Sequence, residues 1–148
     1  MRLFDLHCDT LYECYTKKQN LLKNRLQLDL MRGLRGGEGW AQVFAVWMPD
    51  TLRGQAAYAQ CLAILGFARE QERLYGGQMR LARTAEDIRD AVASRRCAAL
   101  LSIEGGSALA GRLEALEQFA ACGVRMITVT WNGENELSCG SGCGKPDG

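Results

Sequence analysis

Residues 98–106 read AALLSIEGG: six mainly apolar residues, then a carboxylate and two glycines that end the run. A short apolar run bounded by turn residues is typical of a buried strand in a parallel sheet. Residues 124–131 (VRMITVTW) repeat this pattern. Two earlier runs, 41–48 (AQVFAVWM) and 3–6 (LFDL), bring the number of predicted strands to four.

Helical patterns lie between these strands. Residues 55–75 carry apolar side chains three to four positions apart. Thr84, with Asp87 three residues later, predicts a capping box at the start of a second helix that buries Ile88, Ala91 and Val92. A third helix is expected to end at Gly123 and to bury Leu109, Leu113, Leu116 and Ala120.

The alternation of strands and helices predicts an α/β protein of the parallel (β/α)8 TIM-barrel type. Residues 17–39 are expected to form a long loop with one short helix. Four strand–helix units are about half of an eight-stranded barrel of ~250 residues. We therefore expect residues 1–148 to be one domain, the amino-terminal half of a barrel whose carboxyl-terminal half is absent.

The composition indicates a soluble globular protein. Of the 148 residues, 47% are hydrophobic and 24% are charged, and the net charge of +1 favours neither nucleic acid nor a membrane surface as a partner. Seven cysteines without a regular spacing are expected to be mostly reduced. Without a signal sequence or an apolar run of ~18 residues, the expected compartment is the cytoplasm.

His7 and Asp9 follow the first predicted strand and are the first candidates for chemistry. Residues two apart in a strand point to the same face, so both side chains can reach one cation, whereas Cys8 between them would face the helices. An imidazole nitrogen and a carboxylate oxygen are both zinc ligands. The alternative is that His7 is a hydrogen-bonded residue at a strand end.

Glu104 is the second candidate, at the end of the 98–103 strand and before Gly105 and Gly106. A carboxylate has two oxygens and can bridge two metal ions about 3.5–4 Å apart. Alternatively, Glu104 caps the next helix or pairs with an arginine.

The third candidate is the segment WNGENE at 131–136, where Trp131, Asn132 and Asn135 are possible substrate-binding residues. The alternative is an ordinary Asn-Gly turn. Cys139 and Cys143 have a spacing compatible with a metal clip, but no second pair of ligands follows them, which argues against a structural zinc.

In this order, FDLHCDT, AQVFAVWM, LLSIEGG and ITVTWNGEN resemble the membrane (renal) dipeptidase family, particularly its bacterial branch. This resemblance implies a (β/α)8 barrel of the amidohydrolase type that holds two zinc ions and hydrolyses dipeptides through a metal-bridging hydroxide. It implies that His7 and Asp9 bind one zinc and that Glu104 is the catalytic carboxylate bridging both. Residues 131–135 would then lie beside the substrate.

The chain departs from the family in one respect. The family takes further histidines, an arginine and a proton-transferring aspartate from later strands, and His7 is the only histidine here. The alternative to a dipeptidase is therefore a non-catalytic half barrel that self-associates or binds a partner chain, such as the missing half. A deacetylase or lactonase of the same fold is a third possibility, which the EGG and WNGEN segments argue against.

Overall fold

The computed structural model describes residues 3–143. The ends of the expected domain, residues 1–2 and 144–148, lie outside the described part. The elements, in chain order, are β1 (Phe4–Cys8), α1 (Thr10–Thr16), α2 (Leu30–Gly33), β2 (Trp40–Trp47), α3 (Gly54–Tyr75), β3 (Met79–Leu81), α4 (Ala85–Ala93), β4 (Cys97–Glu104), the 3-10 helix η1 (Gly106–Leu109), α5 (Glu114–Cys122) and β5 (Val124–Thr128).

The strands form one parallel sheet in the order β1-β2-β4-β3, with β5 also paired to β4. β3 pairs with the first residues of β4 and β5 with the last, so both lie along the same edge of β4. The α/β class and the parallel sheet are as predicted. The sequence analysis did not predict β3, because a strand of three residues is too short to show a hydrophobic period.

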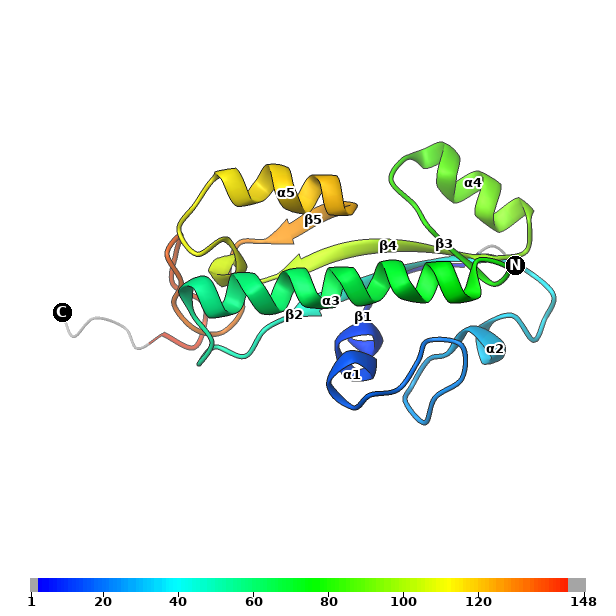
Figure 1. Cartoon of the computed structure of the whole chain (residues 1–148), viewed down its shortest axis with the longest axis horizontal. Helices are drawn as coiled ribbons and strands as arrows, with labels where there is room; N and C mark the ends of the chain where they lie inside the picture. The colour runs from blue at the N-terminus through cyan, green and yellow to red at the C-terminus, as the bar shows by residue number, and fades with distance from the viewer. Residues whose placement is uncertain (1–2, 144–148) are drawn as a thin grey trace.

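All strands run in one direction, toward the left of Figure 1, where β4 and β5 end beside the loop that follows β5. β3 ends earlier, opposite Ala99. β5 ends at Thr128, three residues earlier than its apolar pattern predicted. The residues after it, including Trp131, therefore belong to a loop at the carboxyl edge of the sheet.

The two faces of the sheet are covered unequally. Phe44, Val46, Leu101 and Ile103 pack in one large core with α1, α3 and α5. On the other face, α4 packs on small side chains at the amino ends of the strands. On this face, which we call the inner face, Phe4 at the amino end and Met126 near the carboxyl end are exposed.

Several helix signals in the sequence are confirmed. α3 begins at Gly54 and ends at Tyr75. Thr84 Oγ1 accepts a hydrogen bond from Asp87 N at 3.1 Å, and Asp87 Oδ2 accepts one from Thr84 N at 3.0 Å, which completes the capping box. Gly123 ends α5 with φ of 104°, which glycine adopts without strain. Within residues 3–143, no helix is both long and apolar enough to cross a membrane.

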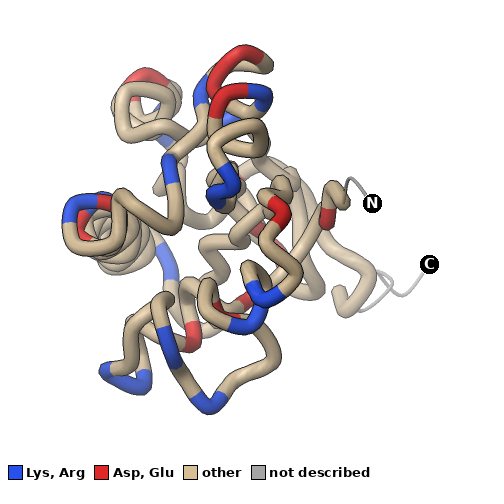
Figure 2. Tube along the Cα trace, turned by 90° about the vertical axis from the view of Figure 1, so that its right-hand side faces the viewer, with Lys and Arg blue, Asp and Glu red and all other residues tan. Residues whose placement is uncertain are grey.

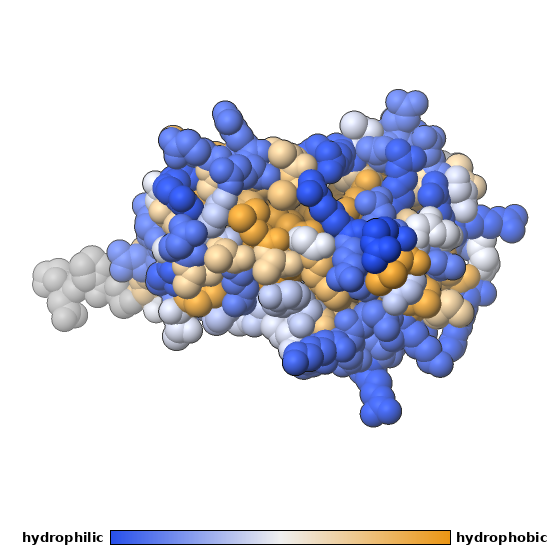
Figure 3. All heavy atoms as spheres, in the orientation of Figure 1, coloured by the Kyte–Doolittle hydropathy of each residue, from blue (hydrophilic) through white to orange (hydrophobic). Residues whose placement is uncertain are grey.

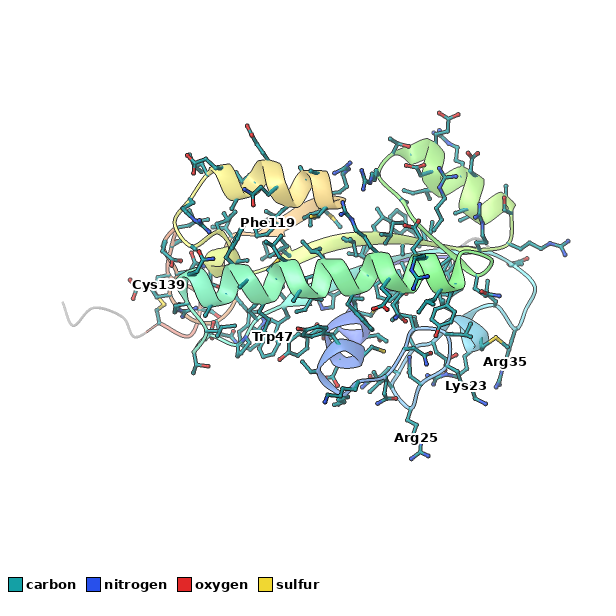
Figure 4. All side chains as sticks on the ribbon, viewed as in Figure 1. Lys23, Arg25, Arg35, Trp47, Phe119 and Cys139 are labelled. Carbon is teal, nitrogen blue, oxygen red and sulfur yellow. A yellow bond between two sulfur atoms is a disulfide. The ribbon has the colours of Figure 1, made fainter. Side chains whose placement is uncertain are left out.

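The predicted buried face of the third helix is wrong at Leu113, Leu116 and Ala120, which are exposed. Leu109 is buried as predicted, but it lies in η1. α5 begins at Glu114, so Leu113 lies before it and is exposed. Ala115 and Phe119, four residues apart, face the core instead, and Phe119 points from α5 toward the sheet (Figure 4). Leu116 is 39% exposed. The apolar residues of this helix form two stripes, and the stripe that contains the Phe119 ring packs against the sheet.

Hydrophobic residues reach the surface between α5 and α3, surrounded by hydrophilic ones (Figure 3). Lys and Arg are intermixed with Asp and Glu over most of the trace (Figure 2). The exception is residues 17–35, which carry six basic residues and one acidic residue, Asp29. A groove of about 680 Å³ also opens at the amino end of the inner face, between β1 and α4, with Phe4, Ile88 and Val92 among its lining residues. Exposed apolar surface is therefore a feature of the sheet and of its edges.

Substitutions in α5 test which stripe is buried. Phe119→Ala should lower the free energy of unfolding by about 3–5 kcal/mol, the usual cost of removing a buried aromatic ring. Leu116→Ala should lower it by less than about 1 kcal/mol, because that side chain is already partly in water. Urea denaturation of both variants measures the difference, and equal losses would contradict this packing.

Candidate metal centre

Three ligand-type side chains come together at the carboxyl edge of the sheet. His7 lies in β1, Asp9 follows that strand directly, and Glu104 is the last residue of β4. β2 separates β1 from β4, so the side chains converge across the end of the strand between them. Asp9 stands at the N-cap of α1 but makes no capping hydrogen bond, so α1 does not engage its carboxylate.

The distances between these side chains are short. His7 Nε2 lies 3.4 Å from Asp9 Oδ1 and 3.7 Å from Glu104 Oε2. One ligand atom from each residue lies within 4.8 Å of the others. The side chains of His7 and Asp9 are 52% and 54% exposed and that of Glu104 is 19% exposed, so the cluster is open to an ion from solvent.

The donor set fits zinc. One imidazole and two carboxylates are common zinc ligands, and in a tetrahedral site with bonds of ~2.0–2.1 Å the ligand atoms lie about 3.4 Å apart. The His7–Asp9 distance has this value, and the His7–Glu104 distance exceeds it by little. Small side-chain rotations are enough to bring the three atoms onto one ion.

Burial raises the pKa of the Glu104 carboxyl, and the nearby Asp9 carboxylate raises it further. His7 and a side-chain hydrogen bond from Trp131 act in the opposite direction. A partly desolvated carboxylate beside a second one is an unfavourable arrangement that a bound cation would relieve.

The thiol nearest these ligands belongs to Cys8, which faces away from them. Its strand partner is Phe44, and it packs against the large core, as its position between His7 and Asp9 predicted. Burial raises the pKa of the Cys8 thiol to about 11. Cys8 therefore lines the helical side of the sheet and not the ligand cluster.

The two glycines after Glu104 bring a loop against it. Gly105 has φ of 98°, in the left-handed region that favours glycine. A Cβ on Gly106 would lie 2.7 Å from Leu137 Cδ1 and 2.8 Å from the carbonyl oxygen of Val129, so any side chain there would collide with the loop. In the Glu-Gly-Gly sequence, the candidate ligand Glu104 is therefore followed directly by the glycines against which residues 129–138 pack.

Trp131, Asn132 and Asn135 all lie in this loop, at the same edge as the ligand cluster. Asn135 Nδ2 donates to the carbonyl oxygen of Val129 at 2.8 Å, and its Oδ1 accepts from Leu137 N at 2.8 Å. Asn132 Oδ1 accepts from Ser141 Oγ at 3.3 Å. Both amides take part in the loop's own structure. The roles of Trp131, Asn132 and Asn135 toward a substrate stay predictions.

Two features of this edge were missed by sequence reasoning. Trp47, at the end of β2, is the ladder partner of Glu104, and parallel register cannot be read from sequence. Figure 4 labels Trp47 at the end of β2. Cys139 and Cys143 form a disulfide, while Cys8, Cys14, Cys61, Cys97 and Cys122 are free thiols, so most but not all cysteines are reduced.

Two of the solved structures that share this fold are metallopeptidases. A dipeptidase of metallopeptidase family M19, named dipeptidase AC, superposes with a TM-score of 0.79 at 26% identity over 91% of this chain and 44% of its own. A metallopeptidase from Rhodobacter sphaeroides, bound to a phosphinate mimic of the dipeptide L-Ala-D-Ala, superposes with a TM-score of 0.78 at 23% identity. The match covers 91% of this chain and 47% of that structure. The probable dipeptidase PvdM from Pseudomonas aeruginosa superposes with a TM-score of 0.63 at 24% identity, over 77% of this chain and 31% of its own.

The chain thus spans less than half the length of each of these structures. No curated protein sequence matches it significantly. The family model described as membrane dipeptidase (peptidase family M19) matches residues 1–147, almost the whole chain. This match and the shared fold agree with the resemblance of the strand-end motifs, and the chain belongs to the membrane dipeptidase family, M19.

Proposed function

We propose that this chain is the amino-terminal half of a zinc-dependent dipeptidase barrel and that it supplies zinc ligands to the active site. The observation that carries the proposal is the convergence of His7, Asp9 and Glu104 at the carboxyl edge of a parallel sheet. Barrel enzymes place their chemistry at that edge. The family supports hydrolysis of dipeptides as the reaction.

In this proposal His7 and Asp9 would hold one zinc ion, and Glu104 would supply a carboxylate ligand to the same centre. Zinc, when bound, supplies polarisation of the scissile carbonyl and a lowered pKa for water. Glu104 is the least exposed of the three, so it fixes the position of the centre relative to the sheet. His7 and Asp9 lie at the open side, where an ion enters.

The proposed substrate is a dipeptide that approaches from the same open side. The M19 relative from Rhodobacter sphaeroides holds a phosphinate mimic of L-Ala-D-Ala, which supports a small amide of this kind. Trp131, Asn132 and Asn135 are the proposed residues on this chain's side of the substrate site. The remaining contacts and the other zinc ligands would come from a second half, because His7 is the only histidine in the chain.

The chain is also proposed to associate through its sheet, with a second copy or with the missing half. Within residues 3–143, β1 has no partner strand on its outer side, and β3 and β5 have none on theirs. Unpaired parallel edges and the exposed Phe4 and Met126 of the inner face are surfaces that proteins normally cover.

Zinc titration of the chain tests the proposed ligands. Asp9→Asn and Glu104→Gln should each weaken zinc binding by more than about 100-fold, beyond the 10–100-fold typical of losing an outer-shell partner. The matched control is Asp90→Asn, an exposed carboxylate on α4 at the opposite end of the strands, which should leave binding unchanged. Calorimetry measures the affinities, and circular dichroism verifies that the fold is kept.

The same substitutions separate the two candidate functions. In a longer protein that contains this chain, Glu104→Gln should abolish dipeptide hydrolysis without unfolding the barrel. Zinc affinity that is equal in the Asp9 and Glu104 variants and in the wild type would instead favour the non-catalytic half barrel.

Light scattering tests the proposed association. The chain has a mass of 16.3 kDa, and we expect a solution mass of at least twice that value, falling on dilution, because the inner face and both sheet edges are open. A mass of 16.3 kDa at every concentration would count against association through these surfaces.

A further inference from the structure

The Cys139–Cys143 disulfide differs in its surroundings from the other cysteines of the chain. The other five are free thiols at buried or half-buried positions, whereas Cys139 is exposed. Burial raises the pKa of the Cys14 and Cys61 thiols to about 12, so both stay protonated and unreactive. The disulfide is therefore the cysteine pair that a thiol in solvent reaches most easily.

The turn that this disulfide closes packs on the neighbouring part of the loop. Gly142 N donates to the carbonyl oxygen of Asn132 at 2.7 Å, and Gly140 N donates to that of Gly133 at 3.2 Å. Ser141 Oγ donates to Asn132 Oδ1 at 3.3 Å. All three donors lie between the two cysteines, so the residues inside the disulfide turn hold the segment at 132–133.

The fit extends to Trp131 and through it to the edge of the sheet. A Cβ on Gly140 would lie 2.3 Å from the carbonyl oxygen of Trp131, so the turn admits no side chain there. The Trp131 ring contacts that of Trp47 with centroids 5.2 Å apart, and Trp47 is the ladder partner of Glu104. Figure 4 labels Cys139 at the end of the molecule where β4 and β5 end. The disulfide turn thus supports a segment that borders the candidate metal centre.

These contacts depend on the disulfide because the turn has little else to order it. The two cysteines are four positions apart, and two of the three residues between them are glycines, Gly140 and Gly142. Glycine loses more conformational freedom on ordering than any other residue. In the chain-entropy model, a cross-link that closes so short a loop shifts the local opening equilibrium by roughly 20–30-fold.

We propose that Cys139–Cys143 is a thiol–disulfide exchange site: its oxidised form holds Trp131 and Asn132 in place, and its reduced form releases them. Exposed disulfides are the labile ones, and a small thiol such as glutathione is the co-reactant. The exposed Cys139 sulfur is the one attacked, because Cys143 is half-buried.

The exchange balances with two thiols. The first thiolate bonds to Cys139 Sγ, the Cys139–Cys143 bond breaks, and Cys143 leaves as a thiolate that takes up a proton. The second thiolate bonds to the sulfur of the first reductant and displaces Cys139, which is then protonated. The chain gains two electrons and two protons, and the two reductant molecules become one disulfide.

The consequence for substrate binding rests on the proposed function, in which Trp131 and Asn132 lie on the substrate side of the site. The exchange itself needs neither zinc nor substrate. Reduction would loosen the proposed substrate side and leave His7, Asp9 and Glu104 in place, because these three side chains belong to β1, the start of α1 and β4.

The first experiment follows the redox state of the folded, zinc-free chain in buffers that range from oxidised to reduced glutathione. Alkylation and mass spectrometry then count the thiols. Cys139 and Cys143 should pass reversibly between disulfide and dithiol within this range, while the buried Cys61 and Cys97 stay unlabelled. A pair that remains oxidised in reduced glutathione alone, or remains reduced in oxidised glutathione alone, overturns the proposal.

The second experiment measures amide hydrogen exchange at Gly142 in the oxidised chain, in the reduced chain and in the Cys139→Ser/Cys143→Ser double variant. Protection of this amide should fall by roughly 20–30-fold in the last two. The Leu30 amide, which makes a 2.9 Å backbone hydrogen bond elsewhere in the chain, should not change. Cys122→Ser is the matched control, since it removes a half-buried free thiol and should leave Gly142 protected.

These readouts separate the proposal from the proposed function. Equal Gly142 protection in the oxidised and reduced chains would mean that the disulfide holds nothing, and the proposal would fail while the zinc site stands. Loss of protection in Cys122→Ser as well would also overturn it, because the effect would then be general destabilisation. A failed zinc titration would refute the proposed function and leave both redox readouts interpretable, because neither uses zinc.

Discussion

The parallel ladder between β2 and β4 is the constraint on which the rest of this structure depends. Eight consecutive residues pair in register, from Trp40 with Cys97 to Trp47 with Glu104. A slip of one residue would exchange the two faces of a strand, so this register decides that Glu104 points to the inner face while Leu101 and Ile103 point to the helices. The ladder thus fixes the core and the position of the candidate metal centre together.

The sequence predicted those parts of the fold in which one local rule dominates. The apolar run of β4, the long period of α3 and the capping box at Thr84 each specify their element locally. β3 is too short for a hydrophobic pattern, and its position depends on pairing with the edge of the first residues of β4 that β2 does not occupy. α5 was misread because its two apolar stripes are equivalent in sequence, and only the tertiary packing of Phe119 distinguishes them.

The candidate site shows the same division. Identical strand direction brings all carboxyl ends to one edge, so His7, Asp9 and Glu104 could be expected to meet without any distance being known. The neighbours of Glu104 could not be expected in this way. Trp47 is there through interstrand register, and Trp131 through the fit of its loop against Gly106. Sequence therefore indicates the ligand residues of such a site more readily than the residues that surround them.

The most direct test of the account is X-ray absorption at the zinc edge of the zinc-loaded chain. The chain carries seven cysteines, so a sulfur ligand is a real alternative to the proposed set. The ligand set of His7, Asp9 and Glu104 predicts a first shell of nitrogen and oxygen only, at ~2.0–2.2 Å, because Cys8 faces the helices and the Cys139–Cys143 pair is a disulfide. A zinc–sulfur distance of ~2.3 Å would contradict the assignment of His7, Asp9 and Glu104 as the metal ligands.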